Sequence, residues 1–174
     1  MDGGRWFAAT SLEGVSTPVV AAVRELLRML DAVQPTALDR HRSHIVTSGH
    51  GWHEYEAEVL LAHRDGDEAD VTLAAGPAGA LVSWLTTHEH VYPKDGIGER
   101  PWTTVAVDAV AGVLRGEYVV EEHYRGERLI KTTVRDLRDG ERAVTTTGSL
   151  LNLLPSLRRV DRVEGRTISF DCLA

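Results

Sequence analysis

Residues 116–147 read GEYVVEEHYRGERLIKTTVRDLRDGERAVTTT, and this stretch decides the fold of the chain. It contains three runs rich in Val, Ile, Tyr and Thr, residue types that favour β-strands. The runs are separated by Arg125-Gly126 and Asp139-Gly140, pairs that are typical of tight turns. The stretch therefore predicts a three-stranded antiparallel meander.

Two helices are predicted upstream of this meander. The first begins at Thr17-Pro18, where a capping residue precedes a proline, and its amphipathic pattern ends before Pro35. The second begins at Pro101 and ends at Gly116. It is apolar on nearly all sides, so we expect it to be the more buried of the two helices.

The segment between the helices has the pattern of another meander. A short strand is predicted for 44–48, and Glu54 to His63 alternates as a half-buried strand does. Turns at Asp65-Gly66 and Gly76-Pro77 lead into two further predicted strands. The next segment, His88 to Arg100, is polar and contains glycine, and it is predicted to be an irregular loop.

A final hairpin around Gly165 is predicted from two short segments, 160–164 and 167–173. The fold class is therefore α+β, with two helices packed on a curved, mainly antiparallel sheet of about seven or eight strands, in the order helix, meander, helix, meander. A length of 174 residues favours one domain spanning residues 1–174. The predicted core residues lie in the apolar phase of the strands: Tyr55, Val59, Leu61, Leu73, Val120 and Val134.

Composition excludes several classes of protein. The chain has 19 basic and 26 acidic residues and a formal net charge of −7, which argues against nucleic acid as a partner and favours a basic protein. No segment has the ~20 uninterrupted apolar residues of a membrane span, and no signal peptide is recognisable. Cys172 is the only cysteine, so we expect a reducing, cytoplasmic location. The scarcity of lysine suggests a GC-rich bacterial source.

Common cofactor and catalytic motifs are missing from the sequence. It contains no GxGxxG after a strand, no GxxxxGK[ST] and no GxSxG, so no cofactor is expected. Histidines occur at His41, His44, His50 and His53, and again in the triplet His88-Glu89-His90. An HxH pair on a strand can bind a metal, but we interpret these residues as surface histidines and expect no metal site.

Glu122 is the strongest candidate for acid-base chemistry. If Tyr118, Val120 and Tyr124 face inward, alternation places Glu122 on the same inner face, where a carboxylate is poorly hydrated. Glu122 could then be a general acid, with His88 and His90 as further catalytic candidates. The alternative is a structural pair with a basic residue across the strands, and the sequence does not decide which neighbour meets Glu122.

Candidate binding residues fall into two groups. Glu54, Glu56 and Glu58 form an acidic stripe at two-residue spacing after Trp52, which can match a row of basic side chains with an aromatic anchor. The second group belongs to the predicted loop and the helix start after it, where binding residues often concentrate. Its members are His88, Glu89, His90, Tyr92 and Trp102.

The sequence favours a small acidic cytoplasmic protein that binds a basic protein partner and occludes it. At the level of architecture the chain resembles the small acidic α+β immunity proteins that bacteria pair with toxins, and this resemblance implies an inhibitor that covers a toxin's active site. One alternative is a small enzyme or ligand-binding protein with a cavity beside a buried carboxylate, Tyr and His. Another is a chaperone or structural subunit.

Overall fold

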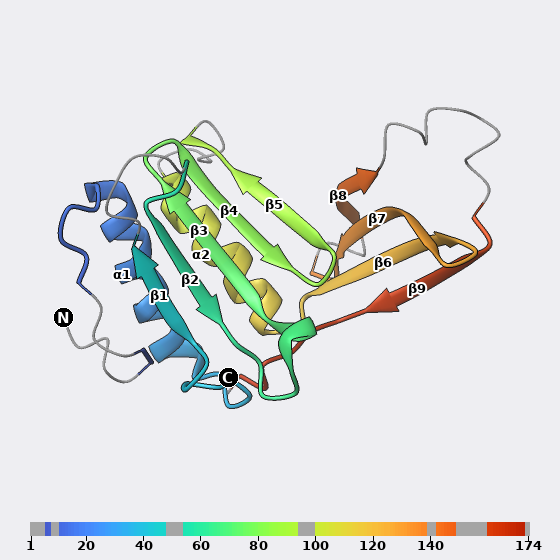
Figure 1. Cartoon of the computed structure of the whole chain (residues 1–174), viewed down its shortest axis with the longest axis horizontal. Coiled ribbons are helices and arrows are strands. Elements are labelled where there is room, and N and C mark those ends of the chain that lie inside the picture. Colours follow the sequence, from blue (N-terminus) through green and yellow to red (C-terminus); the bar gives the residue numbers. More distant parts are fainter. Residues whose placement is uncertain are drawn as a thin grey trace.

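The computed structural model describes residues 6–7, 11–47, 54–93, 100–138, 142–148 and 160–172. Two helices and two antiparallel sheets make up this part of the chain (Figure 1). In chain order the elements are α1 (Thr17–Val33), β1 (His44–Thr47), β2 (Ala57–Leu61), η2 (Asp67–Ala69), β3 (Val71–Gly76), β4 (Gly79–Trp84), β5 (Thr87–Val91), α2 (Trp102–Leu114), β6 (Tyr118–Arg125), β7 (Arg128–Asp136), β8 (Arg142–Gly148) and β9 (Arg162–Arg166). The α+β class and the order of helix, meander, helix, meander are confirmed.

The first sheet is a five-stranded meander in the order β1-β2-β3-β4-β5, and both helices lie on one of its faces (Figure 1). The strand register aligns Val59, Leu73 and Val82 in one row on the helix-covered face, and each is at most 1% exposed. Burial of apolar side chains on this scale is the main force that holds such a layer together. Five of the six predicted core residues are buried; Tyr55, just before β2, is only partly buried.

Helix α1 begins at the predicted Thr17-Pro18 and ends at Val33. The next residue, Gln34, has a left-handed backbone (φ 45°) that turns the chain, and its N–H donates to the Leu30 carbonyl. Helix α2 packs beside it and is buried on almost every side, because small alanines and Gly112 let it approach both sheets closely. No helix among the described residues is long and apolar enough to cross a membrane.

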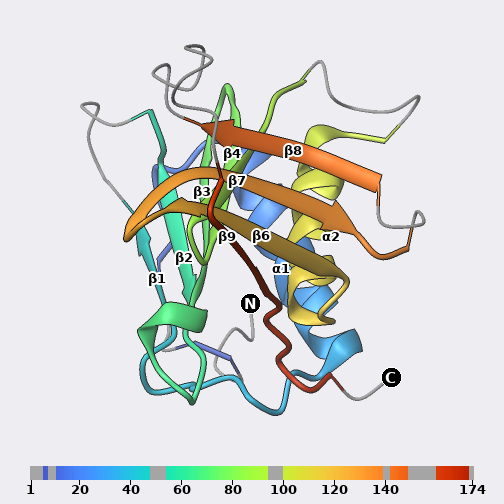
Figure 2. The same cartoon turned by 90° about the vertical axis from the view of Figure 1, so that its right-hand side faces the viewer.

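The second sheet has the order β8-β7-β6-β9 and extends away from the end of the first sheet (Figures 1 and 2). The strands of the predicted sheet are thus divided between two sheets. Where they meet, the ring of Trp84 on β4 lies 5.9 Å from that of Tyr118 on β6. Arg166 of β9 also donates to Glu68 of η2 at 2.8 Å, which joins the two sheets at a second place.

The predicted final hairpin around Gly165 is wrong. Gly165 lies inside β9 and pairs with Glu121, so the segment continues as one strand along β6. The chain then returns to the first sheet's layer, where Phe170 is fully buried and its N–H donates to the Leu114 carbonyl at 2.8 Å. A bridge between Pro35 and Cys172 completes this return.

The predicted loop from His88 to Arg100 is also wrong in its first part. Residues Thr87–Val91 form β5, the edge strand of the first sheet, paired with β4. Its polar composition follows from its position at the edge of the sheet. Because one face of the strand is uncovered, only every second side chain has to be buried. Thr87 and Val91 supply those inward positions and are buried.

Candidate functional site

One face of the first sheet is not covered by either helix, and we call it the open face (Figure 1). Strand register assigns two adjacent cross-strand rows to it. One row consists of His44, Leu60, Thr72, Ser83 and His88. The other consists of Val46, Glu58, Ala74, Leu81 and His90. Tyr92 extends this face beyond β5, because its ring stacks on His90 at 5.8 Å.

The open face carries exposed apolar and aromatic side chains at both of its edges. Val46 is 54% exposed and Tyr92 is 42% exposed, although both are large hydrophobic side chains. At the β5 edge the rings of His88 and His90 meet edge to face at 5.2 Å, and His90 continues into the stack with Tyr92. Exposed apolar and aromatic groups next to one another are typical of surfaces that bind other molecules.

The charged side chain of the open face is the carboxylate of Glu58, which is exposed on β2. Neither row contains Lys or Arg. Residues 1–115 contain 9 basic and 16 acidic residues, whereas residues 116–174 contain 10 of each, so the formal net charge of −7 belongs entirely to the part that carries this face. The field around the open face therefore favours a positively charged partner.

The predicted acidic stripe is divided by the structure. Strand β2 begins only at Ala57, so Glu54 and Glu56 precede the regular alternation. Glu56 accepts a hydrogen bond from the Ser16 N–H at 2.8 Å and thereby serves the start of α1. Glu54 stays exposed and lines a small hollow with Tyr55, His90 and Tyr92. Burial raises the pKa of Tyr55, and the neighbouring Glu54 and Tyr92 raise it further.

The remaining binding candidates lie elsewhere. Glu89 is on the opposite, helix-covered face from His88 and His90, because adjacent strand residues point to opposite sides. Trp102 is the first residue of α2 and is only 8% exposed, so it packs in the core. Trp52 lies outside the described residues.

Glu122 faces inward as predicted and is 1% exposed. The Thr86 hydroxyl donates to its Oε1 at 2.6 Å, and the Tyr124 hydroxyl donates to its Oε2 at 2.8 Å. The guanidinium of Arg166 lies 3.8 Å from Oε1. Because Thr86 belongs to the turn between β4 and β5, this carboxylate links the two sheets, and both of its oxygens are occupied.

Two charged residues of the neighbouring strand β7, Arg135 and Asp136, have partners other than Glu122. Arg135 donates to Glu121 at 2.7 Å, and Asp136 accepts from Arg138, which also donates to the Tyr118 hydroxyl at 2.8 Å. His88 and His90 contact each other and Tyr92 at the edge of the open face. The structure therefore does not assemble the three catalytic candidates, Glu122, His88 and His90, into one described contact cluster.

Sequence reasoning missed several residues of the open face, chiefly Val46, Leu60 and Leu81. The sequence feature that could have identified them is the alternation within His44–Thr47, Ala57–Leu61 and Gly79–Trp84. It places these three residues on the face of the sheet that points away from the helices. Among the described residues, no group of three or more His, Cys, Asp or Glu side chains is placed to hold a metal ion. No known family, no curated protein and no solved structure matches this chain.

Proposed function

We propose that this chain is a protein-binding protein that covers a basic patch of its partner with the open face. One observation carries the proposal: a sheet face free of helices presents exposed apolar and aromatic side chains together with Glu58, and it contains no Lys or Arg. Burial of these apolar and aromatic side chains would supply affinity, and the carboxylates would supply orientation and a fast encounter.

Tyr92 and Val46 are the expected anchors of this interface. They are among the most exposed large hydrophobic residues of the described chain, and they lie towards opposite edges of the open face. Tyrosine is enriched among residues that dominate binding energies, because it buries a large ring while keeping a polar hydroxyl at the rim. Glu54 and Glu58 would add long-range attraction for a basic partner.

Within this class we propose an immunity or inhibitor role in the bacterial cytoplasm, in which binding occludes the partner's own working surface. The acidity of residues 1–115, the single cysteine and the architectural resemblance to immunity proteins support this narrower proposal. A chaperone would use the same face on an unfolded client. An enzyme acting through Glu122 is less favoured, because both oxygens of that carboxylate are hydrogen-bonded and it is 1% exposed.

The proposal is tested by capturing partners from the native host with matched variants of the chain. Glu58→Arg reverses a charge on the open face, and Val46→Ser removes an exposed apolar group from it. Glu127→Arg makes the same charge reversal at the exposed turn between β6 and β7 and serves as the control. We expect one basic protein to be retained by the wild type and by the control but lost from both open-face variants.

Binding kinetics with the purified partner then test the electrostatic part. Replacing both Glu54 and Glu58 by Gln removes two charges with little change of shape, so association should slow and should depend less on salt. Glu56 is left in place because it supports α1. A partner bound equally well by Glu58→Arg, Val46→Ser and the double Gln variant would place the interface elsewhere and overturn the proposal.

A further inference from the structure

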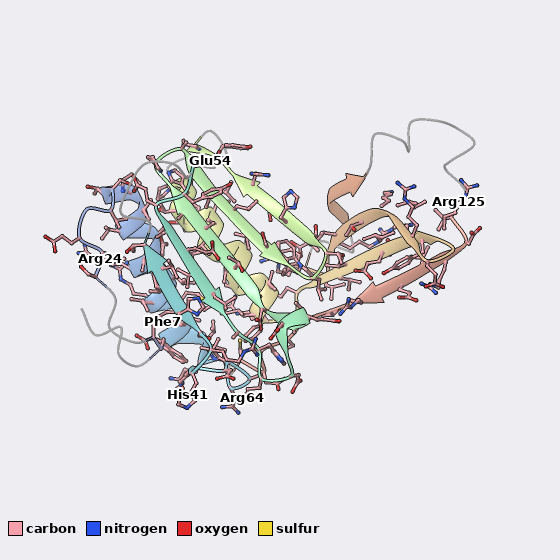
Figure 3. All side chains as sticks on the ribbon, viewed as in Figure 1. Phe7, Arg24, His41, Glu54, Arg64 and Arg125 are labelled. Atoms are coloured by element: carbon pink, nitrogen blue, oxygen red, sulfur yellow. The ribbon has the colours of Figure 1, made fainter. Side chains whose placement is uncertain are left out.

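A pocket of about 230 Å³ lies beside the C-terminal end of α1, among residues that are not part of the open face. The chain turns at Gln34, runs through Thr36 and Leu38, and pairs Leu38 with His63 next to Arg64. The side chains that matter for its chemistry are Trp6, Gln34, Thr36, Arg40 and Arg64. Figure 3 shows Arg64 at the opposite end of the view from Glu54 and far from Arg24 on α1.

The pocket is cationic in a chain that is acidic. Arg40 and Arg64 are both exposed at its rim, and neither guanidinium forms an ion pair with a carboxylate of the described residues. Arg42 shows the contrast, because it lies close to Arg40 in the sequence but binds Asp67 and Asp70. Two arginines that face a pocket without carboxylate partners offer hydrogen-bond donors suited to an anion.

Trp6 orients one of these arginines. The guanidinium carbon of Arg40 lies 4.8 Å from the centre of the indole ring, and Trp6 itself is only 2% exposed. The indole N–H donates to Asp31 Oδ1 at 2.7 Å, so the ring is held in place by a carboxylate that does not line the pocket. A stacked guanidinium keeps the donors at its edge available, so the stack prepares Arg40 for an oxyanion.

The end of helix α1 contributes a smaller charge of the opposite sign at the pocket. Helix α1 ends at the pocket, and a helix C-terminus carries the equivalent of about half a negative charge. The two guanidinium cations that line the pocket outweigh that partial charge. The pocket is also larger than the cavity of roughly 150 Å³ that takes up benzene, so a ring can enter with the anion.

We propose that this pocket binds a small organic anion: a carboxylate or phosphate monoester on a compact ring. The oxyanion would accept hydrogen bonds from Arg40 and Arg64, and the ring would occupy the rest of the pocket beside Gln34, Pro35 and Thr36. The site is independent of the proposed protein-binding function, because it shares no residue with the open face.

Phenyl phosphate is the probe, and the readout is the indole N–H signal of Trp6 in two-dimensional ¹⁵N NMR, which Trp6→Phe identifies among the four tryptophans. We expect a saturable shift with a dissociation constant below about 1 mM. Arg40→Gln and Arg64→Gln should each weaken binding by about tenfold or more, since each removes a charged hydrogen bond. Arg24→Gln removes the same charge from a distant, exposed site and should leave binding unchanged.

Comparison of phenyl phosphate with three other ligands assigns the chemistry. Benzoate tests a carboxylate on the same ring, and phenol tests the ring without the anion; inorganic phosphate tests the anion without the ring. We expect benzoate to bind and both fragments to bind more weakly than phenyl phosphate. Absence of saturable binding, equal binding by a variant with both arginines replaced, or equal binding of phenol would overturn the proposal. Circular dichroism of each variant confirms that the comparison is made between folded proteins.

Discussion

A carboxylate buried between two sheets is tolerated only where its oxygens find hydrogen-bond donors. Glu122 meets this condition through Thr86 and Tyr124. Alternation along residues 118–124 predicted that Glu122 faces inward. Its partners were not predictable, because Thr86 precedes Glu122 by 36 residues and lies in a turn between two strands of the other sheet. Sequence periodicity reports which face a residue occupies, whereas the contact across two sheets depends on how the sheets pack.

Glu122 is therefore expected to stabilise the fold. Glu122→Ala leaves two hydroxyl groups without their acceptor and opens a cavity, and it should lower the free energy of unfolding by about 3 kcal/mol. Glu122→Gln keeps the shape and can still bond both hydroxyls, so it should cost about 1 kcal/mol or less. Urea denaturation of both variants measures the difference. Equal, negligible losses would show that the carboxylate does not link the sheets.

His123 lies on the opposite face of β6 and makes stability depend on pH. Burial lowers its pKa, the positive charge of Lys131 lowers it further, and Arg135 adds to this against the opposing Glu121. In the unfolded chain the histidine has a pKa of about 6.5, so the unfolded chain binds a proton at this position more readily than the folded chain does. The stability contributed at this position is therefore fully present above the pKa of the unfolded chain. It is lost as the pH falls from there towards the lower pKa of the folded chain.

Replacement of His123 removes this dependence without touching the other histidines. We expect the wild type to lose more stability than His123→Gln between about pH 7.5 and pH 5.5. Urea denaturation of the two proteins at both pH values gives the comparison. A wild type that loses the same free energy as His123→Gln would contradict the role assigned to the burial of this ring.

At the scale of elements, Gly112 lets α2 approach the second sheet. A Cβ at this position would lie 2.6 Å from Cε2 of Tyr118, whose ring packs against Trp84 and whose hydroxyl accepts a hydrogen bond from Arg138. Gly→Ala inside a helix normally stabilises by about 1 kcal/mol. Here the overpacking, which costs about 1 to 3 kcal/mol, should exceed that gain, because the ring is held from two sides.

Gly112→Ala is accordingly expected to lower the free energy of unfolding. The same substitution in a Tyr118→Ala background should instead be neutral or stabilising, since the obstructing ring is gone. A double-mutant cycle measured by thermal or urea unfolding isolates this coupling. A stabilising effect of Gly112→Ala in the wild-type background would show that α2 can move away from Tyr118 at little cost.

The elements themselves were predictable where pattern and turn signals agree. Helices α1 and α2 and the hairpin β6-β7 begin and end within a few residues of the predicted positions. Strand β5 was missed because four of its five residues, Thr87, His88, Glu89 and His90, are polar. Strand β9 was misread because Gly165 resembles a turn residue, although here it pairs within a strand. Both errors concern edge strands, whose composition is the least constrained by burial.

The candidate sites depend on contacts that the sequence encodes only through the whole fold. The open face could be derived from strand phases once β5 is recognised, and the acidity of residues 1–115 is visible directly. The pocket of Arg40 and Arg64 could not, because Trp6 reaches it from a segment far away in the sequence. Its chemistry arises from loops, where no periodic pattern constrains side-chain direction.

At the scale of the whole molecule, the chain after β9 determines whether the two sheets unfold together. Phe170 is fully buried, and its backbone bonds to Leu114 of α2 and to Ala37 after α1. In the sequence, the strands of the second sheet thus lie between α2 and the segment of Phe170, and this segment packs into the core of the first sheet and its helices. We predict that the whole chain is one cooperative unit, because neither sheet can lose its packing without freeing this segment.

Phe170→Ala tests this coupling. Truncating a buried Phe should lower the free energy of unfolding by about 3 to 5 kcal/mol. Hydrogen exchange measured by mass spectrometry reports the loss separately for β2 and β3 and for β6 and β7. In one cooperative unit, the slowest-exchanging amides of all four strands lose the same free energy of protection, because they exchange through the same global opening. If β6 and β7 keep wild-type protection while β2 and β3 lose theirs, the second sheet folds independently and the single-unit prediction fails.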